Sequence, residues 1–246
     1  MLSYQMFATR PTLSEPIDSI PFGGQIKGFP CTVYINNEFY GLFTFNTAKD
    51  SDMLLLSDEE NQLAIQGFLN SRGAKFYENH VTVAVDGTTE DFEILFPEEI
   101  PNESQQADID RLFTFVNSST DEEFVRDFEM YYDLTSVIDW MLLIDFTAQT
   151  DMNGKNIIHV TYDRKKWFAV PYDQDNSYGV HFTGEIETDT DFNILDPSNN
   201  INKLFKRVLT HFSKEVVTRY DELVVANVLT TQNITTLYQT FIPKTT

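Results

Sequence analysis

The spacing of apolar residues divides the chain into a β-type part and a helical part. Up to about residue 100, apolar and polar residues alternate in the runs "CTVYINNEFYGLFTFN", "QLAIQGFL", "HVTVAVDG" and "FEILF". Alternation with a period of two is typical of half-buried strands. The first run predicts a hairpin, because Asn36 and Asn37 offer a turn between two alternating stretches. Residues 1–28 contain several prolines and predict an irregular segment.

The period changes to that of a helix after about residue 105. Apolar residues fall three or four apart, at Ile109, Leu112, Phe113 and Val116. Further on, Thr120 and Glu123 match a capping box that begins another helix. The run "DLTSVIDWMLLIDFTAQ" is apolar almost all round and predicts a buried helix. More helical patterns follow in "INKLFKRVLTHF", "KEVVTRYDELVVANVL" and "NITTLYQTF".

One β-type segment interrupts the helical part. The stretch "NIIHVTYDRKKWFAVPY" contains two apolar runs on either side of "DRKK" and predicts a hairpin over residues 157–170. The fold class predicted from this order is α+β, with a β-rich N-terminal lobe over 29–100. A helical C-terminal lobe over 101–246 carries the hairpin. The 246 residues are enough to bury a substantial core.

Charge and cysteine content narrow the function classes. The chain has 17 Lys and Arg against 38 Asp and Glu, a formal net charge of −21. Such a surface repels phosphate backbones, so we expect no nucleic-acid partner; solvation alone is the simplest reason for the charge. The single cysteine, Cys31, excludes an internal disulfide framework. We expect no membrane span, because apolar runs are short, and no removable signal peptide in "MLSYQMFATR".

Oxygen-bearing side chains stand at both ends of the predicted hairpin. Asp151 and Asn156 precede its first strand, and Asp173 and Asp175 follow its second strand. Because the two ends of a hairpin lie close together, these four side chains should converge. Carboxylate and amide oxygens are the ligands of Mg²⁺ and Ca²⁺, so the cluster predicts a cation site. The alternative for Asp173 and Asp175 is a pair of turn-capping residues.

The spacing of two of these residues adds a chemical hypothesis. Asp151 and Asn156 are related as Asp-x-x-x-x-Asn, the spacing in the catalytic loop of protein kinases. In that loop, the Asp accepts the proton of the substrate hydroxyl and the Asn holds magnesium. The motif is short, and the alternative for Asp151 is a turn residue ahead of Gly154.

Several motifs in order resemble one known family. The segments "FYGLFTF", "VIDWMLLIDFTAQTDMNGKNIIHVTYDRKKWFAVPYDQDNSYG" and "RYDEL" resemble the CotH family, the atypical kinases first known from spore coats. The resemblance covers roughly residues 29 to 241, and its specific part runs from Asp151 to Gly179. The form of this part looks most similar to members found in virion and tail proteins of bacteriophages.

The resemblance implies an atypical protein-kinase-like fold and a site for Mg²⁺ and ATP. Asp151 matches the catalytic Asp and Asn156 the catalytic-loop Asn. Asp173 matches the metal-binding Asp, with Asp175 beside it, so the implied metal ligands are Asn156, Asp173 and Asp175. The chain departs from the family where a strand usually carries a phosphate-binding lysine, because Gln66 stands there.

Three other lysines remain candidates for that nucleotide-binding role: Lys49, Lys75 and Lys155. Since the sequence does not single out one of them, we expect Mg²⁺-dependent phosphoryl transfer from ATP to protein Ser or Thr to be weak or absent. The alternatives are a structural or a host-surface-binding component of a phage virion, tail or spore coat that keeps the scaffold without catalysis. The expected location is a virion or an extracellular coat surface, with protein partners in that assembly.

Overall fold

The structure is a computed structural model that describes residues 2–10, 16–85, 87–88, 91–180, 183–186 and 201–241. Its helices are α1 (Leu2–Ala8), α2 (Glu103–Ser118), α3 (Asp121–Tyr131), α4 (Leu134–Thr147), α5 (Lys203–His211), α6 (Ser213–Val225) and α7 (Thr231–Phe241). Its strands are β1 (Gly28–Ile35), β2 (Glu38–Asn46), β3 (Leu63–Gly67), β4 (Val83–Ala84), β5 (Phe92–Phe96), β6 (Ile157–Thr161) and β7 (Trp167–Pro171). The α+β class predicted from the sequence is therefore confirmed.

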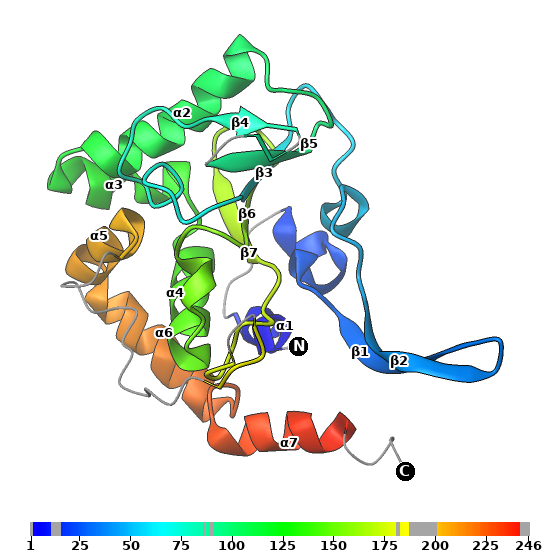
Figure 1. The fold of residues 1–246 in the computed structure, drawn as a ribbon. Helices are drawn as coiled ribbons and strands as arrows, with labels where there is room; N and C mark the ends of the chain where they lie inside the picture. The colour runs from blue at the N-terminus through cyan, green and yellow to red at the C-terminus, as the bar shows by residue number, and fades with distance from the viewer. Residues whose placement is uncertain are drawn as a thin grey trace.

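A five-stranded sheet in the order β4-β5-β3-β6-β7 forms the centre of the fold (Figure 1). Strand β6 pairs antiparallel with β3 and with β7, so the predicted hairpin exists but joins the strands of the N-terminal part. One sheet thus crosses the lobe boundary that the sequence places at residue 100. Strand β3 is buried along its whole length, so its backbone groups need a hydrogen-bonding strand on each edge. Strand β5 supplies one of these strands and β6 the other, which is why the sheet crosses the boundary.

The hairpin of β1 and β2 forms a separate two-stranded sheet, and we call its residues 28–46 the arm. Asn36 and Asn37 both have positive φ, 51° and 66°, as a two-residue turn with the hairpin's twist requires. The arm extends away from the rest of the described chain (Figure 1). The predicted hairpin is confirmed, but it does not pack into the central sheet.

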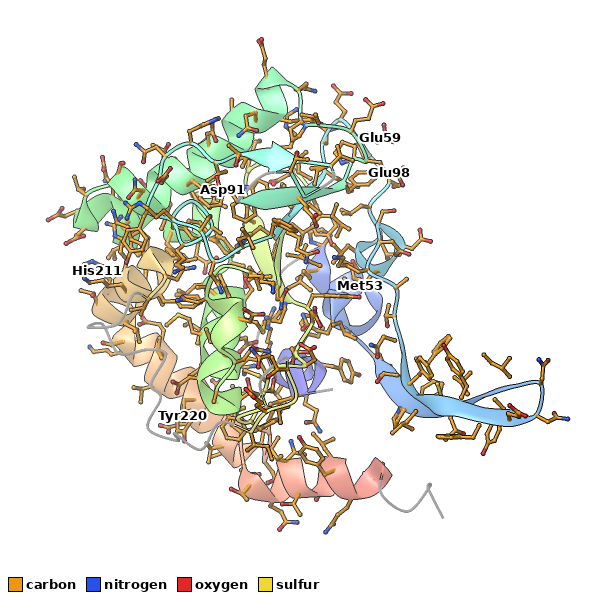
Figure 2. All side chains as sticks on the ribbon, viewed as in Figure 1. Met53, Glu59, Asp91, Glu98, His211 and Tyr220 are labelled. Carbon is orange, nitrogen blue, oxygen red and sulfur yellow. The ribbon has the colours of Figure 1, made fainter. Side chains whose placement is uncertain are left out.

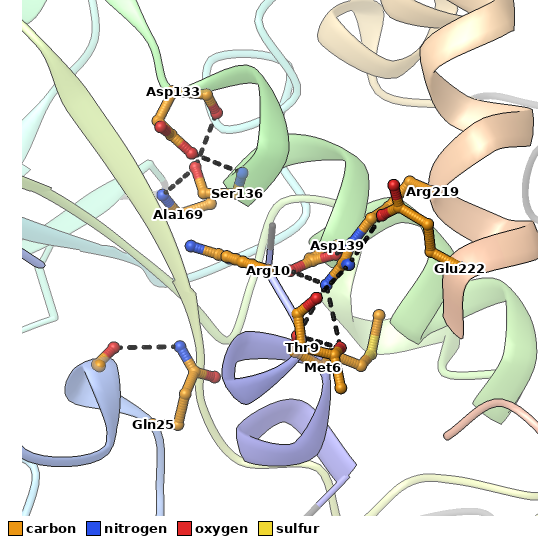
Figure 3. A network of polar contacts seen from close by, with 11 residues as sticks. Met6, Thr9, Arg10, Gln25, Asp133, Ser136, Asp139, Ala169, Arg219 and Glu222 are labelled. Atoms are coloured by element: carbon orange, nitrogen blue, oxygen red, sulfur yellow. Dashed lines mark hydrogen bonds and ion pairs between the residues drawn. The ribbon is translucent and has the colours of Figure 1, made fainter. Parts of the chain in front are cut away.

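Helix α4 is the buried helix that the sequence predicts. Its N-cap residue, Asp133, accepts a hydrogen bond from the Ser136 amide at 2.7 Å. The Ser136 hydroxyl in turn accepts from the Ala169 amide in β7 at 3.1 Å (Figure 3). The first turn of α4 is therefore fixed to the sheet. The predicted capping box of Thr120 and Glu123 is also present and begins α3.

A buried ion pair network ties three distant segments together (Figure 3). Asp139 in α4 contacts Arg10 at 2.7 Å and Arg219 at 2.8 Å, and all three side chains are almost fully buried. Arg219 belongs to the "RYDEL" segment in α6, and Arg10 follows α1. The N-terminal segment that the sequence predicts to be irregular therefore begins with a helix. It has a fixed position because a buried charge in α4 needs its arginine.

Candidate functional site

The loop between α4 and β6 places Asp151. Helix α4 ends at Thr147, and its C-cap residue Ala148 turns the chain with a left-handed φ of 51°. The next residue, Gln149, accepts a hydrogen bond from the Asp151 amide at 3.3 Å and begins a short 3₁₀ turn, Thr150–Asn153. The indole of Trp140 donates to the Met152 carbonyl at 3.0 Å. The contacts with Gln149 and Trp140 therefore fix the backbone of the turn before and after Asp151.

The end of β3 holds the second half of this loop. The Asn156 amide donates to the Gly67 carbonyl at 3.3 Å, and the Lys155 amide donates to Asn70 at 3.0 Å. A Cβ atom on Gly67 would lie 1.8 Å from the Gly154 carbonyl oxygen. Gly67 is therefore needed for the loop to approach β3 this closely.

Asn156 connects the two ends of the hairpin. Its side-chain amide donates to the Asp173 carbonyl at 3.3 Å, and its own carbonyl accepts from the Tyr172 amide at 3.0 Å. Asn156 and Asp173 both have left-handed φ values, 57° and 51°, which asparagine and aspartate tolerate better than most residues. The structure thus brings Asn156 and Asp173 into contact.

Burial and the charged groups around Asp173 shift the pKa of its carboxyl. Burial raises the pKa of its carboxyl above 3.8; Asp175 raises it further, and Asp151 adds a smaller push in the same direction. Lys155 and Lys49 oppose this rise in the pKa of Asp173. Three acidic and two basic groups therefore share one electrostatic environment, although Lys49 lies about a hundred positions before Lys155 in the sequence.

The three candidate lysines take different positions. Lys155 forms an ion pair with Asp151 at 2.9 Å, and the Lys49 ammonium lies 5.3 Å from the centre of the Tyr172 ring. Lys75 is not among the groups that shift the pKa of Asp173, although its neighbour Ala74 packs beside Gly154. Burial lowers the pKa of Lys75. The structure therefore joins Lys49 and Lys155, but not Lys75, to the acidic residues.

The acidic residues fit a hard cation by their chemistry. Their donors are carboxylate and amide oxygens, and three carboxylates share this environment with two lysines. In the described ranges, no group of three or more His, Cys, Asp and Glu side chains is arranged as a metal site. Lys155 occupies one side of Asp151. A cation would therefore bind to Asn156, Asp173 and Asp175 more readily than to Asp151.

The family of this chain follows from a comparison with models of protein families. The family model described as CotH kinase protein matches residues 27–242 of this chain. The chain belongs to the CotH kinase family. The match includes the arm, the central sheet and the acidic loop, which confirms the resemblance found in the motifs. A search of curated proteins finds no match.

A cavity of about 340 Å³ opens beside the acidic residues of this CotH domain. It is mainly apolar, and it lies between the segment after β7 and helices α1, α4 and α7; its lining includes Leu2, Thr147, Asp175, Tyr178, Ile234 and Tyr238. Its volume is at the lower end of the range of small-molecule pockets.

None of the helices in the described segments is both long and apolar enough to cross a bilayer.

Some residues of the CotH site are not visible as candidates in the sequence. Gln149 and Asn70 fix the loop through hydrogen bonds to its backbone, and such roles leave no motif. The glycine of "QLAIQGF" was a usable signal, because a glycine at the end of a strand often marks a close backbone approach. The cavity-forming helices α1 and α7 join the site only through the tertiary fold.

Proposed function

We propose that this CotH chain transfers the terminal phosphoryl group of ATP to a Ser or Thr hydroxyl of a protein, with Mg²⁺ as cofactor. The observation that supports it best is the group formed by Asp151, Lys155, Asp173 and Lys49. Asp151 and Lys155 are in contact at 2.9 Å, and both lysines lower the pKa of Asp173. Phosphoryl transfer requires a base, metal ligands and cations for phosphate in one place.

Each residue then has a role set by its position. Asp151 accepts the proton of the acceptor hydroxyl, since it stands on a turn whose backbone is held by Gln149 and Trp140. Asn156, Asp173 and Asp175 hold magnesium, which when bound neutralises charge on the phosphates. Lys155 and Lys49 contact phosphate oxygens. The cavity beside Asp175 gives the nucleotide base an apolar surface.

The net charge of −21 should slow phosphoryl transfer. An acidic surface repels a triphosphate, and the Lys155 ammonium is already paired with Asp151. Binding of ATP must therefore redirect Lys155 from the carboxylate to a phosphate. We expect slow turnover and tight dependence on Mg²⁺ for this reason.

The test is label transfer from γ-labelled ATP, with Mg²⁺, to the chain itself and to a Ser-rich protein acceptor. Asp151→Asn should lose the transfer, and Asp221→Asn, an exposed acid on α6, should keep it. Calorimetry measures Mg²⁺-dependent ATP binding separately. Binding without transfer would leave a nucleotide-binding scaffold, and absence of both would overturn the proposal.

A second candidate is a non-catalytic role as a structural or surface-binding component of a virion, phage tail or coat. The feature that favours it is the arm, whose apolar side chains are exposed. Protein partners in such an assembly and a location on its surface belong to this candidate. It is preferred if the chain binds no nucleotide while the arm is required for incorporation into particles.

A further inference from the structure

The arm carries apolar side chains that the rest of the described chain does not cover. Eight large apolar residues in it are between 46% and 66% exposed: Phe29, Tyr34, Ile35, Phe39, Tyr40, Leu42, Phe43 and Phe45. None of them belongs to either of the two core clusters. Figure 2 shows the side chains of the arm standing apart from those of the body. Soluble monomers rarely expose so many adjoining apolar side chains.

The strand register divides these side chains between two faces. Phe29 stands opposite Phe45, and Cys31 stands opposite Phe43, so these four lie on one face, which we call the phenylalanine face. Phe29 and Phe45 stack with ring centres 5.5 Å apart, and Tyr40 stacks on Phe43 at 5.7 Å. The phenylalanine face is therefore an ordered aromatic surface.

The backbone of the arm is also incompletely paired. In the described chain, β1 and β2 pair only with each other, so each strand has one free edge. A two-stranded hairpin alone in water is marginally stable and needs a further strand or packing surface. Free edges and apolar faces are the features through which sheets of two chains join.

We propose that the arm joins two copies of this chain, packed arm against arm about a two-fold axis. This inference is independent of the proposed catalysis. Only one face of each arm can meet the other arm. With about 200 Å² for each large aromatic side chain, the exposed parts of Phe29, Phe43 and Phe45, with Tyr40 stacked on Phe43, amount to about 470 Å². Two arms therefore bury about 900 Å² in total, which is the size of a weak, reversible dimer interface.

The distribution of charge also favours a dimer through the arm. Glu38 is the only charged residue in the arm, so nearly all of the net charge of −21 lies on the body. Two bodies of such charge repel each other at short distance, but salt screens this repulsion beyond about 8 Å. The arm extends from the body (Figure 1) and keeps the two bodies apart while its uncharged faces meet. An antiparallel edge is also self-complementary, which suits a two-fold dimer.

Sedimentation velocity over a range of concentrations tests the dimer. The double variant Phe43→Asp/Phe45→Asp should raise the dissociation constant of the dimer about 30-fold or more, since it removes the centre of the interface. The control is Val217→Asp/Val225→Asp, which adds the same charge at exposed apolar positions of α6 and should leave the dissociation constant unchanged. Below the concentration at which the parent dimerises, both variants should keep its urea unfolding curve, because neither changes a residue of the core clusters.

Two further measurements separate this proposal from other partners. Raising the salt concentration from about 10 mM to about 150 mM should strengthen the dimer, because the screening length falls from about 30 Å to about 8 Å and the bodies then no longer repel each other. A spin label on Cys31, the only cysteine, should give a single inter-chain distance that disappears in the double variant. A monomer at every concentration, or equal weakening by the two double variants, would overturn the proposal. Binding to neutral phosphatidylcholine vesicles without self-association would also overturn it, in favour of a lipid surface.

Discussion

Stability at acid pH should depend on one buried histidine. His159 in β6 is fully buried among aromatic rings, and its Nδ1 forms a hydrogen bond with the Tyr132 hydroxyl. Its Nε2 has no hydrogen-bond partner in the described structure. Burial lowers the pKa of His159 from 6.5 to about 3, because a charged imidazole would lose its hydration there.

The direction of the effect follows from proton linkage. Between these two pKa values the unfolded chain binds a proton at this histidine and the folded chain does not, so the folded state is destabilised as pH falls below 6.5. From about pH 7 to about pH 4.5, the free energy of unfolding should fall by about 2.5 kcal/mol on account of His159.

The assay is urea unfolding followed by circular dichroism at several pH values, for the parent and for His159→Gln. Carboxylates also titrate in this range, so the informative quantity is the difference between the two proteins. His159→Gln should be less stable near neutral pH by about 1–3 kcal/mol, but it should lose about 2.5 kcal/mol less on acidification.

His80→Gln is the matched control, because the side chain of His80 is largely exposed. This variant should change the pH dependence of the parent by less than His159→Gln does. Proton NMR of the imidazole gives an independent measure of the pKa of His159. A parent and a His159→Gln variant with the same pH dependence, or a His159 that titrates near pH 6.5, would refute the reasoning.

Three other predictions concern stability and the site. Asp139→Ala removes the carboxylate that two buried arginines share and should lower the free energy of unfolding by about 3–5 kcal/mol in urea, whereas Asp221→Ala on the surface should change it by less than about 0.5 kcal/mol. Gly67→Ala should cost about 1–3 kcal/mol and weaken ATP binding in calorimetry, because the added methyl group meets the Gly154 carbonyl. Asp173→Asn should stabilise the fold near neutral pH and abolish Mg²⁺ binding; because the folded-state pKa is raised, this gain should vanish in unfolding experiments below about pH 3.8.

Local patterns were sufficient for much of the fold. The turn at Asn36 and Asn37, the capping box at Thr120 and the buried helix α4 each depend on residues close in sequence. Asp151 and Asp173 could also be placed together, because one hairpin of known direction connects them. These features need no information about long-range contacts, which explains why the sequence predicts them.

Long-range pairing was not predictable in the same way. The alternation in "QLAIQGFL" indicates a strand, but nothing in it indicates that β3 accepts β6 as a neighbour across about ninety residues. The helix α1 was missed because its position depends on the contact of Arg10 with Asp139. Lys49 could be named only as one of three lysines, since its approach to Asp173 depends on the path of the chain after the arm.

The charges of the acidic residues indicate a functional site, whereas their packing does not. Three carboxylates, those of Asp151, Asp173 and Asp175, face two lysines. Burial first, and then the charge of Asp175, raise the pKa of Asp173, so its ionised form destabilises the fold. Elsewhere in the chain, Asp139 is fully paired by Arg10 and Arg219, as a charge with a structural role should be. A cluster that opposes folding in this way is typical of a functional site, because the excess charge is available for a cation.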